Sequence, residues 1–529
     1  MDDDETVLER GALYAGRGKI AAVADVSAPP PAGFEGVEPV DVKGTIYPGL
    51  MELHNHLAYN ALQLWQVPKR YTNRDQWGGT SNPDYRRLIS GPMRLIGPDP
   101  ELMPALVRYV ECKALLGATT TSQGLQLFSN TGAQHYFRGS LRNVEKTDDP
   151  ALPGAAAKIA DVAAATAEAF LAALKRKRCY ILHLSEGTDE AARAHFLALD
   201  LPGDAWAITD SLAGIHCAAL QPEDFDVLAV HDASMVWSPL SNLLLYGQTA
   251  DVAAAKAAGV KIALGSDWSP SGSKNVLGEL KAARVASRLA GDVFSDRELV
   301  AMATRTPAQI LKWDSELGTL EAGKRPDLVV VAGTAGDPYA RLLSADERAI
   351  SLVCIGGVPR YGTRALVERL GGEGLESVRV GGRQRVVNLR QQSADPVVGT
   401  LTLADAAARL RDGLANLKTL AEEAEAQGTT RHAMLAASAR GEQAWRLALD
   451  EIEPEPTEVE LRPRVARDGR PTGPEIRTAA PRLPLSQVIG PLELDALTVA
   501  DHPGWLDVLD GQPNLPAGMA AGVRELYGA

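Results

Sequence analysis

The chain of 529 residues lacks several features that mark whole classes of protein. Its four cysteines lie far apart and form no CxxC pair, which argues against a disulfide framework and favours reduced thiols in a cytoplasmic protein. No apolar run approaches the length of a membrane span, so no membrane contact is expected. The net charge of −13 provides no basic excess to displace counterions from phosphates, so nucleic acid is not an expected partner.

The N-terminus lacks a secretory signal as well. The first residues, MDDDET, are acidic, and no basic segment followed by an apolar one is present. This absence also favours a cytoplasmic location.

Residues 49–313 alternate short apolar runs with longer helical stretches. The runs GLMELHNH, CYILHL, AGIHCA and VKIALGSD are typical of buried strands, and amphipathic or alanine-rich stretches separate them. Strands that alternate with helices indicate parallel βα units. About eight such units fit into roughly 250 residues, which predicts an α/β fold with a (β/α)8 TIM-like barrel.

The regions on both sides of this barrel have strand character. Residues 1–48 contain short β-like segments, and residues 314–365 contain ELGTLEAGKRPDLVVV and SLVCIGGVPRYG. Because the chain would leave the early segments, form the barrel and then return, we expect one small composite β domain built from both flanks. Residues 366–529 then form a C-terminal extension.

The extension is predicted to be helical at first and extended later. Apolar residues spaced three and four apart indicate a helix over 402–425, and Thr402 with Asp405 resembles a capping box at its start. A second helix is expected over 430–450, so that helices cover 402–450. Seven prolines among charged residues predict a linker over 454–484.

Four histidines and an aspartate lie at or near the ends of predicted strands. His54 and His56 are two apart on one strand, so both imidazoles point to the same face and can converge on one ion. His183 follows CYIL, His216 follows AGI, and Asp267 follows KIALGS. A single buried histidine is more often a core residue, but barrel active sites are built at these strand ends. The four histidines and Asp267 together therefore predict an active site at the ends of these strands.

These motifs, in this order, resemble the amidohydrolase superfamily. YPGLMELHNH is similar to its first-strand metal motif, and HLSE to the His-x-x-Glu motif of the mononuclear cytosine/guanine deaminase and chlorohydrolase branch. GIHC, WSPLSN and LGSDWSP are similar to its later strands, and GTLEAGKRPDLVV with GGVPRYG to its C-terminal β segment. The resemblance covers roughly residues 10–365.

The resemblance implies a ligand set for one divalent ion, Zn²⁺ or Fe²⁺, formed by His54, His56, His183 and Asp267. Asp267 would also accept a proton from the attacking water. Glu186 would transfer protons as a general acid, and His216 would bind the substrate or the water and stabilise an oxyanion. No lysine is a good candidate for the bridging ligand of the binuclear branches, which favours a single ion.

The expected activity is the hydrolysis of carbon–nitrogen bonds other than peptide bonds by metal-activated water. Deamination of a heterocycle is the first expectation and hydrolysis of a cyclic amide the second. A hydrolytic dehalogenase would use the same ligands and stays open, as does a non-catalytic binding protein on a decayed barrel. The small zinc nucleobase deaminases are disfavoured because they need a CxxC pair.

A small-molecule substrate is the expected partner, and a homo-oligomer is compatible with the sequence. Aromatic rings could stack on a planar substrate and arginines could bind an acid group, although the segment 63–77 could equally be a packed loop. The substrate-binding candidates are Trp65, Arg70, Trp77, Arg142, Asn242 and Trp268.

The chain departs from the family pattern at both ends. Members usually begin with an extra strand before the acidic turn that MDDDETV resembles, so the β domain is expected to be one strand short. The C-terminal extension is longer than typical members need, and the resemblance assigns it no role.

Overall fold

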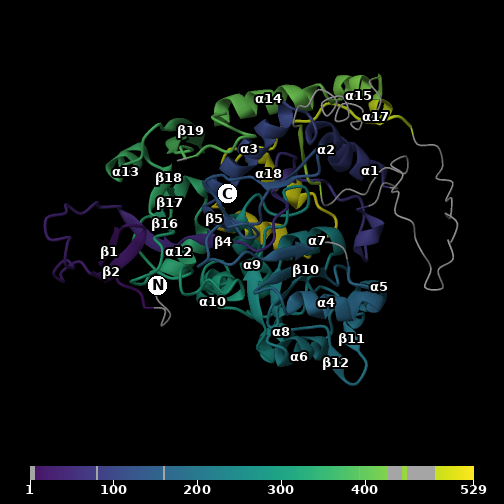
Figure 1. The fold of residues 1–529 in the computed structure, drawn as a ribbon, viewed down its shortest axis with the longest axis horizontal. Helices are drawn as coiled ribbons and strands as arrows, with labels where there is room; N and C mark the ends of the chain where they lie inside the picture. Colours follow the sequence, from purple (N-terminus) through teal and green to yellow (C-terminus); the bar gives the residue numbers. More distant parts are fainter. Residues whose placement is uncertain are drawn as a thin grey trace.

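A computed structural model describes residues 6–78, 82–158, 161–391, 393–426, 444–449 and 483–528. Within these residues, parallel strands that follow one another in chain order form the centre of the molecule (Figure 1). One sheet has three strands: β4 (Leu50–Met51), β5 (Thr119–Ser122) and β8 (Arg142–Asn143). The other has five: β9 (Ala156–Lys158), β10 (Tyr180–Leu184), β13 (Leu212–His216), β14 (Ser234–Trp237) and β15 (Lys261–Leu264).

Backbone hydrogen bonds connect the two sheets at their edges. The amide of Ala155 donates to the carbonyl of Val144 at 2.8 Å, and the amide of Leu53 donates to that of Leu264 at 3.2 Å. The strands nevertheless form two sheets rather than one continuous closed sheet. The fold is therefore TIM-barrel-like. The sequence predicted a fully closed barrel, whereas the strand pairing forms two separate parallel sheets.

Helices connect and cover these strands, and several start where the local sequence caps them. Asp189, Asn275 and Ser295 each accept a backbone N–H from the first turn of the helix that follows. None of the described helices is both long and apolar enough to cross a membrane. In chain order the helices are α1 (Pro83–Tyr85), α2 (Gly91–Ile96), α3 (Leu102–Leu116), α4 (Ala167–Leu174), α5 (Glu190–Leu197), α6 (Pro222–Val230), α7 (Pro239–Tyr246), α8 (Val252–Ala258), α9 (Val276–Leu289), α10 (Asp296–Ala301), α11 (Arg305–Ile310), α12 (Pro338–Ser344) and α13 (Arg364–Arg369).

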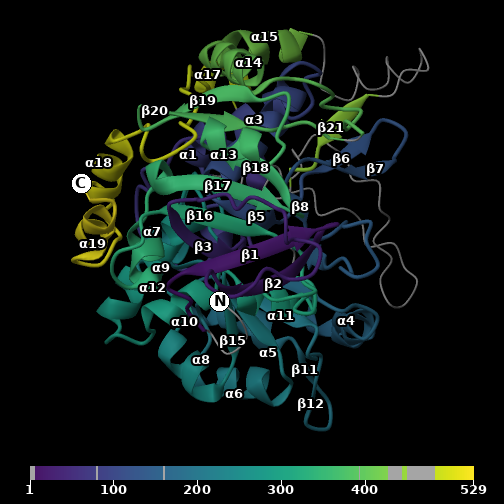
Figure 2. The ribbon, with the colours of Figure 1, turned by 90° about the vertical axis from the view of Figure 1, so that its left-hand side faces the viewer.

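A separate, antiparallel sheet combines strands from both sides of the barrel region (Figure 2). Ile46 from the N-terminal flank pairs with Val330, and Tyr361 pairs with Val387, so the sheet continues beyond residue 365. Residues before this sheet form a separate hairpin. The six strands in spatial order are β19 (Glu376–Val380), β20 (Arg383–Val387), β18 (Val358–Gly362), β17 (Ile350–Ile355), β16 (Leu328–Ala332) and β3 (Gly44–Pro48), and the hairpin is β1 (Gly11–Gly16) with β2 (Lys19–Asp25).

The C-terminal extension begins with α14 (Leu403–Ala415) and α15 (Leu417–Ala426), and α14 packs against α3. The hydroxyl of Thr402 accepts the N–H of Asp405 at 3.1 Å, as the capping motif predicted. The predicted linker 454–484 lies outside the described residues except for its last two positions, and most of the helix predicted over 430–450 lies outside them too.

One short described segment corrects that second helix. Residues Trp445–Leu447 form a strand, β21, antiparallel to β6 (Gln126–Ser129) of a hairpin with β7 (Gln134–Tyr136). The helix prediction is wrong here because these backbone groups pair with a neighbouring strand instead of with each other. The chain ends in α17 (Leu485–Val488), α18 (Gly504–Asp510) and α19 (Met519–Leu526), and Figure 2 has α18 and α19 on the side opposite β21.

A buried charge cluster ties the last part of the chain to the barrel. Each carboxylate oxygen of Asp495 pairs with a different lysine. Oδ2 contacts Lys113 on α3, and Oδ1 contacts Lys274 in the loop after β15. Lys113 also donates to the carbonyl of Asn60 and to the hydroxyl of Ser269, each at 2.7 Å. Although burial raises the pKa of Asp495, the two lysines outweigh it and hold that pKa below its usual range.

Replacing Asp495 by alanine should strongly destabilise the fold. The substitution leaves Lys113 and Lys274 buried without a carboxylate, and breaking a buried ion pair from one side costs about 3–5 kcal/mol. Urea unfolding followed by circular dichroism measures the loss. The exposed Glu493, two residues away, provides the control, and Glu493→Ala should change stability by less than about 0.5 kcal/mol. Equal midpoints for the two variants would contradict the assignment.

Candidate metal centre

The histidines predicted from the strand ends come together in one buried cluster. His183 and His216 belong to β10 and β13, while His54 and His56 follow β4. The ring centroid of His54 lies 4.8 Å from that of His56, 4.7 Å from that of His183 and 5.1 Å from that of His216. All four side chains are buried.

Asp267 completes the cluster from the loop after β15. Its Oδ1 lies 3.0 Å from Nε2 of His54 and 3.7 Å from Nε2 of His56. Burial alone would raise the pKa of Asp267, but the surrounding histidines, His54 first, hold it below its ordinary value. The site therefore keeps an ionised carboxylate beside imidazole nitrogens.

The histidines on β10 and β13 are held neutral. Burial lowers the pKa of both His183 and His216 well below 6.5, and the neighbouring imidazoles lower that of His183 further. A neutral imidazole offers a lone pair to a metal, whereas a protonated one cannot.

The hydrogen bonding of two imidazole nitrogens shows whether the histidines and Asp267 fit a metal ion. Nδ1 of His183 is buried without a hydrogen-bond partner, and Nε2 of His54 faces Asp267 without hydrogen-bond geometry. Nδ1 of His54 lies 3.3 Å from the side-chain oxygen of Gln123, to which it can donate, so the lone pair of Nε2 faces the cluster. Buried nitrogens and a carboxylate that converge in this way are the donors that divalent zinc and iron take. The residues fit such an ion.

The backbone at these strand ends is strained. Ser185, His216 and Asp267 have φ angles of 53°, 67° and 63°, in the left-handed region that residues other than glycine rarely adopt. Such conformations cost about 1–3 kcal/mol each and persist only where the surroundings fix them, most often at functional sites.

A chain of hydrogen bonds fixes the proton on His216. The indole N–H of Trp237 donates to the hydroxyl of Thr249 at 2.7 Å, so that hydroxyl donates onward to Oδ1 of Asn242 at 3.3 Å. The amide nitrogen of Asn242 must then donate to Nδ1 of His216, 3.0 Å away. The proton of His216 consequently sits on Nε2, which lies 3.7 Å from Oε2 of Glu186.

Glu186 is held by groups from two other segments. The phenol of Tyr246 donates to Oε1 of Glu186 at 2.7 Å and accepts the indole N–H of Trp77 at 2.8 Å. Nη1 of Arg74 lies 3.8 Å from Oε2. Burial and the nearby Glu186 carboxylate raise the pKa of Tyr246 well above 10, so its phenol keeps the proton that it donates.

Sequence reasoning missed two residues that position the others. Tyr246 lies four residues after Asn242 on α7, hence on the same helical face, which is the signal that could have found it. Glu52 lies two residues before His54 and is fully buried. It accepts hydrogen bonds from Asn55 at 2.8 Å and Ser122 at 3.1 Å, and also from Ser266, so it connects the ends of β4, β5 and β15.

A cavity of about 180 Å³ opens beside His56 and His183. Its wall includes side chains from the loop after β5, from the β6–β7 hairpin, from the residues just after β8 and from the C-terminal extension. They include Gln123, Gln126, Tyr136, Glu145 and Ala448.

The six substrate-binding candidates do not line this cavity. Trp65, Trp77 and Trp268 are buried, and the rings of Trp77 and Trp268 pack against each other with centroids 5.8 Å apart. Asn242 is buried against His216. Two arginines remain: Arg142 pairs with Asp327 at 3.0 Å, and Arg70 is exposed. The aromatic side chains of segment 63–77 are thus buried inside the protein, while Arg70 of the same segment is exposed.

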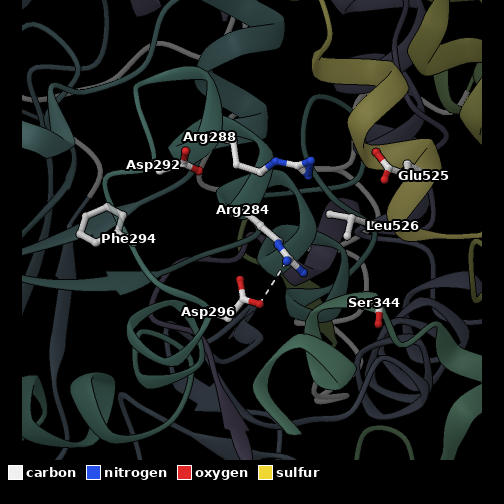
Figure 3. A pocket seen from close by; sticks show the side chains of 8 residues that line it. All are labelled: Arg284, Arg288, Asp292, Phe294, Asp296, Ser344, Glu525 and Leu526. Carbon is white, nitrogen blue, oxygen red and sulfur yellow. Dashed lines mark ion pairs between the residues drawn. The ribbon is translucent and has the colours of Figure 1, made fainter. Parts of the chain in front are cut away.

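A larger hollow of about 570 Å³ lies between α9, α10, α12 and α19 (Figure 3). Charged side chains of both signs line it, and Arg284 pairs there with Asp296 at 3.1 Å. None of its residues belongs to the histidine cluster, and none is a histidine or a cysteine that could join a metal site there. The candidate centre is therefore the cluster at the strand ends.

Substituting His183 by alanine should remove most of the bound metal. The change deletes one of the converging nitrogens and leaves a gap in the donor set. Metal content after dialysis, measured by plasma mass spectrometry, provides the test. The partly exposed His195, which pairs with Asp161, supplies the control, and His195→Ala should retain the metal of the parent protein. Full retention by His183→Ala would refute the cluster as the metal centre.

Comparisons with known proteins agree with this geometry. The sequence model of the Amidohydrolase family matches residues 45–360. A 5-methylthioadenosine/S-adenosylhomocysteine deaminase from Symbiobacterium thermophilum is 24% identical over 379 residues, which cover 63% of this chain and 82% of that protein. A protein of the same name from Moorella thermoacetica is 37% identical over 120 residues, which cover 22% of this chain and 28% of that protein.

Among solved structures, an adenosine deaminase from Xanthomonas campestris with bound zinc has a similar fold. Its TM-score is 0.51 at 18% identity, and the match covers 78% of this chain and 95% of that one. A triazine hydrolase variant gives 0.51 at 19% identity, with 68% and 91% covered. The family match spans more than half of the chain and contains the whole cluster. The chain therefore belongs to the amidohydrolase family, and it is a hydrolase of carbon–nitrogen bonds that depends on a divalent metal.

Proposed function

We propose that this chain deaminates a small nitrogen heterocycle at a mononuclear centre, with Zn²⁺ or Fe²⁺ held by His54, His56, His183 and Asp267. The observation that carries the proposal is the position of Glu186 and His216 beside those four donors, with Nε2 of His216 3.7 Å from the Glu186 carboxylate. A proton donor and an acceptor thus adjoin the metal ligands.

A single ion is supported by the way the ligands overlap. Within the described residues, the two groups that could hold a metal are His54 with His183 and His216, and His54 with His56 and Asp267. Both contain His54, so they describe one centre. The buried Lys113 cannot bridge a second ion, because Asp495 holds it elsewhere.

The residues divide the chemistry among them. A bound divalent ion lowers the pKa of water from 15.7 towards about 7. Asp267, which is ionised, accepts a proton from the attacking water. The N–H on Nε2 of His216 donates to the oxygen on which negative charge develops. Glu186 carries a proton to the departing nitrogen, and Tyr246 and Arg74 fix the direction in which its carboxyl group points.

The substrate class is supported by what the relatives' names share. The deaminases named above act on adenine derivatives, and an S-triazine hydrolase from Gordonia rubripertincta is 26% identical over 163 residues, 30% of this chain and 34% of that protein. A ring with several nitrogens is common to these names. A cyclic amide hydrolase and a hydrolytic dehalogenase remain the alternatives, because both use the same donors.

Product analysis separates these activities. The purified protein would be incubated with 5-methylthioadenosine, adenosine, guanine, a chlorinated triazine and a cyclic amide. Ammonia release supports deamination, halide release would assign a dehalogenase, and a ring-opened product without either would assign a cyclic amidase. A chelator should abolish the activity, and Zn²⁺ or Fe²⁺ should restore it. No turnover of any substrate by metal-loaded protein would contradict the proposed function.

Glu186→Gln should retain the metal and lose most of its turnover. The amide keeps the shape of the side chain but cannot carry the proton, and general acid–base steps contribute roughly 10²–10⁴-fold. The measurements are kcat for ammonia release and metal content. Glu190→Gln, on the exposed first turn of α5, is the matched control and should change neither. Loss of metal from Glu186→Gln would make Glu186 a ligand, and an unchanged rate would remove it from the chemistry.

A further inference from the structure

The loop formed by residues 65–77 rests on three parts of the active-site region. The amide of Trp65 donates to the carbonyl of Pro270 at 2.7 Å, and that of Tyr71 donates to Leu245 on α7 at 2.9 Å. The carbonyl of Thr72 accepts the amide of Thr188, two residues after Glu186, at 2.6 Å. The loop is therefore attached to the segments that carry Asp267, Tyr246 and Glu186.

This loop also brings two side chains to the proposed proton carrier. Arg74 places its guanidinium 3.8 Å from the Glu186 carboxylate, and Trp77 donates to the phenol that holds Glu186. A shift of the loop would move both contacts together. The orientation of Glu186 thus depends on where residues 65–77 lie.

Two side chains near the end of the chain hold the loop from its remaining side. The amide oxygen of Gln512 accepts the N–H of Val67 at 3.2 Å, and its nitrogen donates to the carbonyl of Trp65 at 3.0 Å. The side-chain nitrogen of Asn514 donates to the carbonyls of Lys69 at 3.0 Å and Leu244 at 2.8 Å. Asn514 thus joins the loop directly to α7. Both amides are about 95% buried, so water cannot replace these bonds.

The segment that carries these amides is itself firmly anchored. Asp495 fastens it to Lys113 and Lys274, and the hydroxyl of Tyr109 on α3 donates to the Asp495 carbonyl. Further on, Trp505 and Tyr527 are buried with ring centroids 6.3 Å apart, which packs α18 against α19 (Figure 2). An anchored segment of this kind can fix the side of the loop that α7, the loop after β15 and the residues after β10 leave unsupported.

We propose that Gln512 and Asn514 are positioning residues for the reaction, and that the C-terminal segment 489–528 acts as a clamp which keeps the loop 65–77 against Glu186. The proposal rests on the catalytic role proposed for Glu186, and it gives the C-terminal extension a part in turnover. A segment that only stabilised the fold would affect all parts of the barrel alike. A clamp affects the loop and, through it, Glu186.

The first test measures the loop itself and needs no substrate. In full-length, metal-loaded protein, Asn514→Ala should speed amide hydrogen exchange in residues 65–77, while exchange in β10, β13 and β15 and the metal content stay as in the parent protein. Asn514→Leu, which has a similar size but no N–H to donate, should behave like Asn514→Ala. The control is Arg524→Ala, which breaks ion pairs between α18 and α19 without touching the loop. Unchanged exchange in 65–77, or an equal rise throughout the barrel, would overturn the clamp.

The second test asks whether the effect passes through Glu186. Misplacement of a catalytic group by about 1 Å can cost 10²-fold, so Asn514→Ala should lower kcat roughly 10- to 100-fold. In a Glu186→Gln background the same substitution should cost less than about twofold, because the group that it misplaces is already inactive. Additive losses would overturn the proposal. If the parent protein turns over no substrate, the proposed function fails while the exchange experiment still decides whether the clamp exists.

Discussion

The site depends on two backbone hydrogen bonds between the ends of the first and last barrel strands. The amide of His56 donates to the carbonyl of Asp267 at 2.6 Å, and the amide of Asp267 donates to that of His54 at 3.1 Å. Residues more than two hundred positions apart in sequence are thereby held at the spacing of neighbouring strands. The positions of these donors are thus fixed by main-chain geometry. The buried carboxylate of Glu52 stabilises the same strand ends by accepting hydrogen bonds from Asn55 and Ser266.

The part of the site that lies on strands was predictable from the sequence. His183, His216 and Asp267 each follow a short apolar run, so their places at strand ends could be recognised locally, and the structure brings them together with His54 and His56. The helix cap at Thr402 was predictable for the same reason, since the cap and its partner lie three residues apart. Patterns of this kind carry their information within a few positions.

The rest depends on contacts that no local pattern encodes. An aromatic residue such as Trp77 can stack on a substrate or on another ring, and only the packing of the loop decides between them. The strand at residues 445–447 forms because β6 offers it an open edge, which overrides the helical character of its sequence. The bonds of Gln512 join residues 445 and 447 positions apart. Whether the two parallel sheets join into one likewise depends on the register of neighbouring strands. Short apolar runs in the sequence do not determine that register.

The order of the functional parts along the chain has a consequence for how the protein is made. The proposed metal ligands lie between residues 54 and 267, so they leave the ribosome long before the segment that carries Gln512 and Asn514. On the proposal above, a nascent or prematurely terminated chain could assemble its metal centre without aligning Glu186. Synthesis of the segment 489–528 would then be the step that turns a metal-binding barrel into a working hydrolase.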